Sequence, residues 1–349
     1  MSKALKLITE TFLHMLVDFL CIYSLMMSTT IFQGSIKGLL ILYNIMAFGT
    51  QLIFGYILDK RRNKHAGEMG VYIVVIGALL YQYKVTSVPI NYVLATIVGL
   101  GNSLFHVGTG INVIKSANGR LADLGIFVSS GTLGVLLGRL SIDLDFNRLL
   151  ITVMIALVIS SLYTWILRKD IDNEVEKTYC NIHNIKYKNY IIIWITFISV
   201  VARSLTGWIS PEININNLWL IAPILVFIGK TIGGLIADRL GIRDTAILVM
   251  VLAIVTNLMS LVYSPFALIG IVCNNMLMSI TLGIMVSVIE QYPGFSFGLT
   301  TLALLIGTLP VFKVKNITST LLSTIIYIIV LVCNHIAIGK THEVINRST

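Results

Sequence analysis

Charged residues are scarce in this sequence. Asp, Glu, Lys and Arg make up 12% of its 349 residues, whereas a soluble domain carries about 25%. Hydrophobic residues make up 56%, so most of the chain needs apolar surroundings. These residues form continuous runs and do not alternate with polar ones, which favours helices over strands. The composition therefore predicts an all-α integral membrane protein embedded in a lipid bilayer.

Cysteine is also rare, and sequence motifs for metals or catalysis are missing. No CxxC or Cys/His spacing that would hold a metal is found, and neither is an HExxH motif or a nucleophile–base pair. We therefore expect a protein that is not an enzyme and that has no resident metal or cofactor. Scattered cysteines of this kind are interpreted as small packing residues: Cys21, Cys180, Cys273 and Cys333.

The apolar runs divide the chain into many spans of similar length. A bilayer-crossing helix needs about 20 apolar residues, so with about 29 residues per span and loop the chain accommodates about twelve helices. The first run is too long and too polar for a cleavable signal peptide. The predicted spans are 7–29, 36–58, 66–84, 88–113, 121–140, 147–167, 190–207, 217–237, 244–263, 265–288, 294–312 and 317–338.

The net charge of +9 follows from basic residues that gather in alternate loops. Lys and Arg are found in loops 59–65, 114–120, 168–189 and 238–243, and they are missing from loops 30–35, 85–87, 141–146, 208–216 and position 264. This alternation indicates membrane orientation and not a nucleic-acid partner. It predicts a multi-pass plasma-membrane protein with both termini in the cytoplasm.

Segment 168–189 is the one long polar stretch between predicted spans. It separates six spans from six, so we predict an N-terminal half (1–167), a cytoplasmic linker (168–189) and a C-terminal half (190–349).

A short motif occurs twice, once in each predicted half. The two Asp residues of the motif lie 179 positions apart, about half the chain, which indicates two halves of one plan. The pattern resembles the loop motif of the major facilitator superfamily: Gly, Asp four residues later, a basic residue, Gly and further basic residues. The second copy departs from it at Ile242, and the first at Arg62 and Asn63. The matching residues and their basic neighbour are Gly55, Asp59, Lys60 and Arg61, and then Gly234, Asp238, Arg239, Gly241 and Arg243.

We interpret this motif as a cytoplasmic gate. Asp59 and Asp238 fall at the inner ends of spans 36–58 and 217–237. Each carboxylate can pair with its basic neighbour or face the positive N-terminal end of another helix. Such contacts would form when the cytoplasmic side closes and break when it opens. Alternatively, the basic residues only fix the loops on the cytoplasmic side.

Two polar pairs lie at matching depths in antiparallel spans. His14 and Asp18 are four residues apart on span 7–29, and Asn102 and His106 are four apart on span 88–113. At about 1.5 Å per residue, both histidines lie about 10 Å inside the inner edge and the other two about 16 Å inside. The resemblance implies a major facilitator fold, in which the first, fourth, seventh and tenth spans line a central cavity that all four residues would face.

An Asp beside a His is chemically suited to taking up and releasing a proton. We therefore assign proton coupling to Asp18, His14 and His106, and substrate binding to Asn102 and His106. The alternative is that these residues only hydrogen-bond between helices.

The C-terminal half offers a second polar group. Arg203 can bind an anionic substrate with two parallel hydrogen bonds, and Asn274 and Asn275 lie at similar depth. Lys230 lies within span 217–237 and can pair with a carboxylate in the cavity. For both basic residues the alternative is that the side chain extends to the membrane surface.

Two glycine-rich stretches refine the resemblance. The residues around Asn102–His106 look like the fosmidomycin-resistance branch of the superfamily, although that branch follows the His with Pro and this chain has Val107. Gly131, Gly134 and Gly138 resemble the superfamily's exporter motif, with Val135 in place of its Pro. Close packing of helices through small residues explains the same glycines.

These observations predict a secondary transporter, a monomer that moves a small organic molecule by alternating access. Proton-coupled efflux is the main hypothesis, and the alternative within transport is proton-coupled uptake of an organic anion bound by Arg203. From another class of function, a membrane receptor or scaffold without transport remains open, but it would have no use for a buried Asp18.

Overall fold

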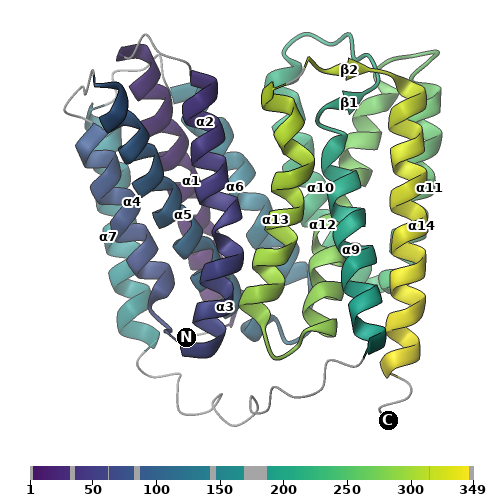
Figure 1. Ribbon diagram of the computed structural model, residues 1–349, viewed down its shortest axis with the longest axis horizontal. Coiled ribbons are helices and arrows are strands. Elements are labelled where there is room, and N and C mark those ends of the chain that lie inside the picture. The colour runs from purple at the N-terminus through teal and green to yellow at the C-terminus, as the bar shows by residue number, and fades with distance from the viewer. Residues whose placement is uncertain are drawn as a thin grey trace. The chain divides into compact units, whose positions relative to one another are not determined.

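The computed structural model describes residues 3–31, 36–61, 63–81, 87–141, 147–168, 187–313 and 315–345. Within these ranges the chain is almost wholly helical (Figure 1). The helices are α1 (Lys3–Ile31), α2 (Ile36–Asn44), η1 (Ile45–Gly49), α3 (Gln51–Arg61), α4 (Ala66–Tyr81), α5 (Val88–Ala117), α6 (Leu121–Leu140), α7 (Asn147–Arg168), α9 (Tyr187–Leu205), α10 (Leu218–Leu240), α11 (Ile242–Met259), α12 (Phe266–Val288), α13 (Pro293–Lys313) and α14 (Thr320–Ile345).

Each of the twelve predicted spans corresponds to helix in the described residues. The second span is made of α2, the π-turn η1 and α3 in succession. Among the described residues, eight helical stretches are long and apolar enough to cross a membrane, and three shorter helices are apolar as well. The predicted all-α membrane fold is confirmed. Of the predicted linker 168–189, residues 169–186 lie outside the described residues, together with Cys180 and the motif position Arg62.

The chain forms two compact units whose boundaries do not follow the linker alone. Unit 1 comprises Met1–Ser116, Ser130–Ile182 and Gln291–Gly298, and unit 2 comprises Ala117–Ser129, His183–Glu290 and Leu299–Thr349. The N-terminal part of α6 therefore belongs to unit 2, and the start of α13 belongs to unit 1. The last residue of α5, Ala117, also belongs to unit 2, so α5, α6 and α13 each contribute residues to both units.

Unit 1 has a core of aliphatic and aromatic side chains from α1, α2, α4, α5 and α7. Val17, Val74 and Phe105 are fully buried in it. The glycines of α5 bring its backbone against α4, because a Cβ added at Gly108 would lie 2.3 Å from the backbone nitrogen of Gly67. The predicted close packing of this glycine-rich helix is therefore seen in the structure.

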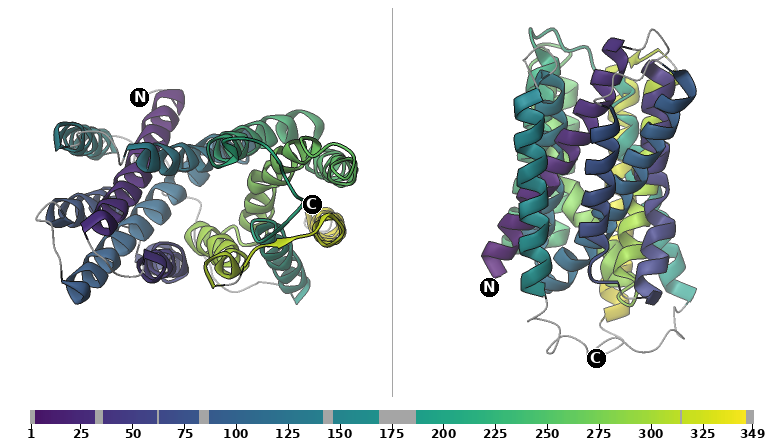
Figure 2. Two further views of the ribbon diagram at one scale, coloured as in Figure 1. Left: turned by 90° about the horizontal axis from the view of Figure 1, so that it is seen from above. Right: turned by 90° about the vertical axis from the view of Figure 1, so that its left-hand side faces the viewer.

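Unit 2 is built from helices that run side by side, as their nearly end-on appearance in Figure 2 shows. α12 packs against α10 and α11, and α9 packs against α14. A two-residue parallel pair joins β1 (Ile209–Ser210) to β2 (Ile317–Thr318). The last span was predicted to begin at 317, but α14 begins at Thr320, because Ile317 and Thr318 are extended and the Ile317 backbone N–H donates to the Trp208 carbonyl oxygen at 2.9 Å. β-Branched residues favour such extended backbone.

Large apolar side chains are exposed along many of the helices. Ile53 is 60% exposed, Ile159 61%, Trp194 61% and Leu321 66%. Water would disfavour so much apolar surface, whereas lipid would not. The outer surface therefore agrees with a multi-pass membrane protein.

Candidate functional site

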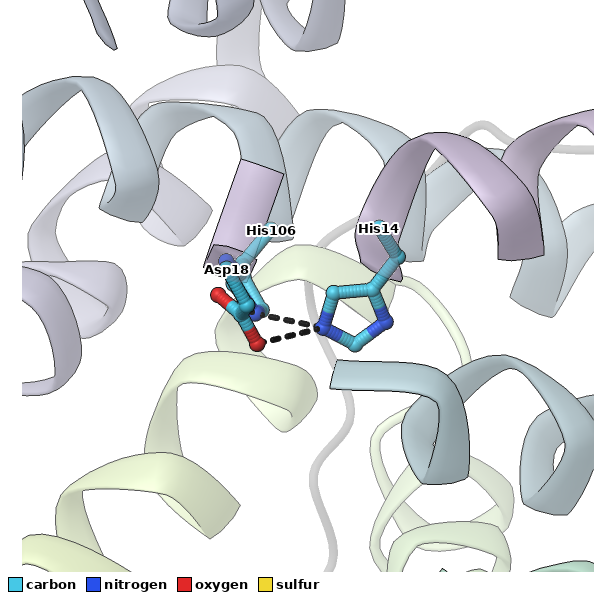
Figure 3. A group of neighbouring side chains, drawn as sticks. All are labelled: His14, Asp18 and His106. Carbon is cyan, nitrogen blue, oxygen red and sulfur yellow. Dashed lines mark hydrogen bonds and ion pairs between the residues drawn. The ribbon is translucent and has the colours of Figure 1, made fainter. Parts of the chain in front are cut away.

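Three side chains from α1 and α5 meet inside unit 1. The His14 Nε2 atom lies 2.7 Å from His106 Nε2 and 3.3 Å from Asp18 Oδ2, and His106 Nε2 lies 3.7 Å from Asp18 Oδ1 (Figure 3). Both histidines are buried, and the Asp18 side chain is 13% exposed. The spacing of four residues places His14 and Asp18 on one face of α1, and His106 approaches from α5. We name these three residues the His–Asp–His cluster.

A second layer of hydrogen bonds holds this cluster. Asn102 donates from Nδ2 to Asp18 Oδ1 at 3.1 Å and to the Tyr43 hydroxyl oxygen. His106 Nδ1 lies 2.9 Å from the backbone carbonyl oxygen of Asn102. Because a carbonyl oxygen only accepts, His106 carries a proton on Nδ1, and in the neutral ring Nε2 keeps its lone pair. The lone pair then faces His14 Nε2 and the carboxylate of Asp18.

Helix α6 closes the space beside the cluster. A Cβ added at Gly131 would lie 2.2 Å from Asp18 Oδ2 and 2.6 Å from His14 Nε2. Further along α6, a Cβ at Gly134 would lie 2.2 Å from the Met15 carbonyl oxygen. The glycines that resembled an exporter motif therefore allow α6 to lie directly on α1, and Gly131 leaves room at the cluster itself.

The structure brings together all four of the polar residues predicted on spans 7–29 and 88–113. Matching depth on antiparallel helices was a sufficient signal for them. Tyr43 was missed, because an isolated tyrosine in an apolar run carries no pattern. Two buried acidic residues were also missed, Glu10 and Glu68, each 1% exposed. Glu68 accepts a hydrogen bond from the Thr164 hydroxyl at 3.0 Å.

The same three side chains have the donor atoms of a possible metal site. One donor atom from each of His14, Asp18 and His106 can be chosen so that all lie within 4.8 Å of one another. No local sequence motif marks this group, because its donors come from two helices that are far apart in the chain.

A buried arginine marks a second polar region, in unit 2. Arg203 on α9 is 4% exposed, and its guanidinium donates to the Met278 sulfur at 3.0 Å. Its Nε has no hydrogen-bond partner, and among the described residues no ion pair to a carboxylate is found for it. The side chain therefore stays inside the unit and does not extend to an exposed end.

The two asparagines predicted at a depth similar to that of Arg203 make different hydrogen bonds. Asn274 donates to the Arg203 carbonyl oxygen at 3.3 Å and to the Thr206 hydroxyl at 3.0 Å, and its Oδ1 has no partner. Asn275 donates to the Ile271 carbonyl oxygen of its own helix at 2.9 Å. Lys230 donates to the Val128 carbonyl oxygen at 3.4 Å.

The two motif aspartates make equivalent contacts, each with the first backbone N–H groups of another helix. Asp59 accepts from the N–H of Gly294 at 2.9 Å and of Phe295 at 2.7 Å, at the start of α13. Asp238 accepts from Leu121 at 2.8 Å and Ala122 at 2.9 Å, at the start of α6. Of the two partners predicted for these carboxylates, the structure shows the helix N-terminus.

The spacing of one helical turn between the glycine and the Asp of each motif has a structural reason. A Cβ at Gly55 would lie 2.2 Å from the Gly294 carbonyl oxygen, and one at Gly234 would lie 2.3 Å from that of Leu121. The glycine lets the backbones touch, and the Asp on the same face then reaches the N–H groups. The basic residues lie outside these contacts: Lys60 lies 4.3 Å from the centre of the Tyr56 ring, and Arg61, Arg239 and Arg243 are exposed. Gly241 has a φ of +89° and ends α10.

Comparison with known proteins identifies the fold. No protein-family model and no curated protein matches the sequence. Among solved structures, the chain is similar to the major facilitator superfamily transporter FucP in the outward conformation, with 14% identity, coverage of 95% of this chain and 99% of that chain, and a TM-score of 0.62. It is also similar to the E. coli fucose:proton symporter FucP, with 13% identity, 97% and 99% coverage, and a TM-score of 0.61.

A third similar structure is a bacterial homologue of the iron transporter ferroportin in the outward-facing state. The identity is 14%, the coverage is 96% of this chain and 98% of that chain, and the TM-score is 0.62. The chain therefore has the fold of major facilitator superfamily transporters, as the repeated loop motif predicted. The resemblance to the fosmidomycin-resistance branch stays a prediction.

Proposed function

We propose that this protein is a secondary active transporter of the major facilitator superfamily that moves a small organic molecule by alternating access. It acts as a proton-coupled exporter and not as an enzyme, as a monomer in the plasma membrane with both termini in the cytoplasm. The fold it shares with FucP and the ferroportin homologue supports transport. The contact between His14, Asp18 and His106 inside an apolar helix bundle carries the proposal.

The chemistry of this cluster supports proton coupling. Ionisable groups within membrane helices are costly and are retained for function. Asp18 lies within reach of two imidazoles and the Asn102 amide, which donates to it and stabilises the ionised carboxylate. The histidines offer sites to which a proton can pass. Solute binding beside Asn102 and His106 would then depend on the protonation of Asp18.

The two Asp–helix contacts supply a reversible gate. A carboxylate at a helix N-terminus is stabilised by the partial positive charge of the unpaired N–H groups, typically by about 0.3–1 kcal/mol and by up to about 2 kcal/mol where it is partly buried. Such contacts are strong enough to hold a state and weak enough to break in each transport cycle. When the contacts break, Asp59 would release the start of α13 and Asp238 would release the start of α6.

A second candidate is proton-coupled uptake of an organic anion. A buried guanidinium without a carboxylate partner is costly, and an anionic ligand would remove that cost. The unpartnered Arg203 Nε and Asn274 Oδ1 favour this reading. The two candidates differ in the direction of transport and in the charge of the solute.

Transport by purified protein in proteoliposomes tests the proposal. A panel of neutral, cationic and anionic small molecules is offered under an imposed pH gradient of either direction. Accumulation of a solute against its own gradient, abolished by a protonophore, is expected for coupled transport. Dependence on the direction of the pH gradient separates export from uptake, and a panel without any pH-driven flux contradicts the proposal.

A further inference from the structure

The His–Asp–His cluster presents two imidazole nitrogens and one carboxylate group as a small triangle. The two Nε2 atoms lie 2.7 Å apart and face different oxygens of the Asp18 carboxylate, with His14 Nε2 at 3.3 Å from Oδ2 and His106 Nε2 at 3.7 Å from Oδ1. From this geometry we infer that the cluster binds one divalent first-row transition-metal ion. Two imidazole nitrogens and a carboxylate oxygen would hold it.

The dimensions of the triangle suit such an ion. Metal–ligand bonds of about 2.0–2.2 Å place neighbouring ligand atoms about 2.8–3.1 Å apart in octahedral coordination and about 3.3–3.6 Å apart in tetrahedral coordination. The two nitrogen–oxygen distances, 3.3 and 3.7 Å, lie close to the tetrahedral spacing, and the two rings have to part by about 0.6 Å to reach it. Three protein ligands leave positions open for water or solute.

The second layer is also typical of a metal site. A ligating His usually donates its other ring N–H to a carbonyl or carboxylate, which fixes the ring and the tautomer. His106 makes this contact with the Asn102 carbonyl oxygen at 2.9 Å, and the Asn102 amide orients Asp18. Both contacts aim lone pairs of His106 and Asp18 toward the centre of the triangle.

The donor set defines the class of ion. Two imidazoles and one carboxylate suit zinc, iron, cobalt, nickel or manganese in the divalent state, whereas calcium and magnesium prefer all-oxygen sites. Zn²⁺ and Co²⁺ are therefore suitable probes. Binding is a property of unit 1 and does not depend on the proposed transport cycle.

The experiment measures binding of Co²⁺ and Zn²⁺ to the full-length protein in detergent after removal of any affinity tag. Co²⁺ is followed by its visible absorption and Zn²⁺ by equilibrium dialysis. We expect one ion per chain and displacement of Co²⁺ by Zn²⁺. Asn102→Ala should weaken binding by about 10–100-fold, as loss of second-layer contacts does, and His106→Gln by more. The matched control His335→Gln changes an exposed histidine on α14 and should bind like the wild type.

A second variant tests the site without removing a donor. Gly131→Ala places a methyl group against Asp18 Oδ2 and His14 Nε2 and should weaken binding, whereas Gly339→Ala, with open space around its Cβ, should not. Circular dichroism and size-exclusion chromatography confirm that each variant is folded. Absence of binding to the wild type, or equal binding by the wild type and folded His106→Gln, would overturn the inference. Metal bound without any pH-driven flux would contradict the proposed function and leave this site standing.

Discussion

The Nε2 atoms of His14 and His106 lie 2.7 Å apart, although 92 positions separate the two residues in the chain. At this distance one nitrogen must donate a proton and the other must accept it. Because His106 uses Nδ1–H toward the Asn102 carbonyl, a neutral His106 is the acceptor and His14 the donor. His14 therefore donates its Nε2–H to His106 Nε2, and both atoms lie close to the Asp18 carboxylate.

This relationship predicts a specific role for His106. His106→Gln removes the imidazole nitrogen that can take up a proton, but its amide can still accept and donate hydrogen bonds in the cluster. Proton coupling should survive in part, with weaker solute binding or a shifted pH optimum of transport. Flux measured across a range of pH checks this, with His335→Gln as the control. A pH profile and an apparent solute affinity unchanged from the wild type would show that His106 only packs between α1 and α5.

The gate contacts predict a graded series at Asp59 and Asp238. Asn keeps one accepting oxygen but loses the second acceptor and the negative charge that the helix N-terminus stabilises, whereas Ala loses both oxygens and about 0.5–2 kcal/mol of capping. Transport should therefore slow with Asp→Asn at either position and slow further with Asp→Ala, while membrane insertion stays intact.

The control for this series is Asp244→Asn, an exposed acidic residue in the first turn of α11. Its turnover should equal that of the wild type. Unchanged turnover in both Asp59→Asn and Asp238→Asn would reduce the motif to a signal for membrane orientation.

Arg203 predicts opposite effects on stability and on anion uptake. Arg203→Met removes a buried charge, so the ligand-free protein should melt at a higher temperature. Uptake of organic anions should be lost, and Arg203→Lys should recover little of it, because Lys lacks the planar fork. Thermal unfolding and anion flux are measured on the same preparations. Anion uptake by Arg203→Met at the wild-type rate would show that Arg203 does not bind the transported anion.

Close packing of α6 on α1 predicts a large effect from a small substitution. Gly134→Ala forces a methyl group to within 2.2 Å of the Met15 carbonyl oxygen, so the helices must separate. Overpacking of this kind typically costs about 1–3 kcal/mol. The melting temperature should fall clearly, whereas Gly339→Ala should leave it unchanged or slightly raised. Equal melting temperatures for the two variants would contradict the packing.

Membrane orientation is tested by single cysteines in a background without the four native ones. Asn63, which is exposed, and Asn184, which lies outside the described residues, should be labelled only from the cytoplasm. Asn216, on the opposite set of loops, should be labelled from outside intact cells. Labelling of Asn63 from outside would reverse the predicted orientation.

Much of the fold was predictable because an apolar run long enough to cross a bilayer must satisfy its own backbone hydrogen bonds, and a helix does so. The predicted span 121–140 coincides with α6, and other boundaries shift by a few residues. The β1–β2 pair was not predictable, since it depends on two segments more than a hundred positions apart coming together. The charge pattern located the motif loops, but it did not choose between a basic neighbour and a helix N-terminus as the partner of Asp59 and Asp238.

Residues of the candidate site could be predicted only where two polar residues lie four positions apart on the same face of a helix. Matching depths identified His14, Asp18, Asn102 and His106. Depth says nothing about rotation around a helix, so the approach of Gly131 to the cluster and the contact of Tyr43 with Asn102 could not be predicted from the sequence. For the same reason the sequence placed Asn275 only at a depth similar to that of Arg203, and the structure shows that its amide donates to the Ile271 carbonyl oxygen.

The most direct test of proton coupling is a comparison of two fluxes in proteoliposomes containing Asp18→Asn. One flux is driven by a pH gradient, and the other is exchange of solute across the membrane without a gradient. Because exchange needs no net proton movement, we expect it to persist while the gradient-driven flux is lost. Gradient-driven accumulation by Asp18→Asn at the wild-type rate would contradict the central claim that this carboxylate couples transport to protons.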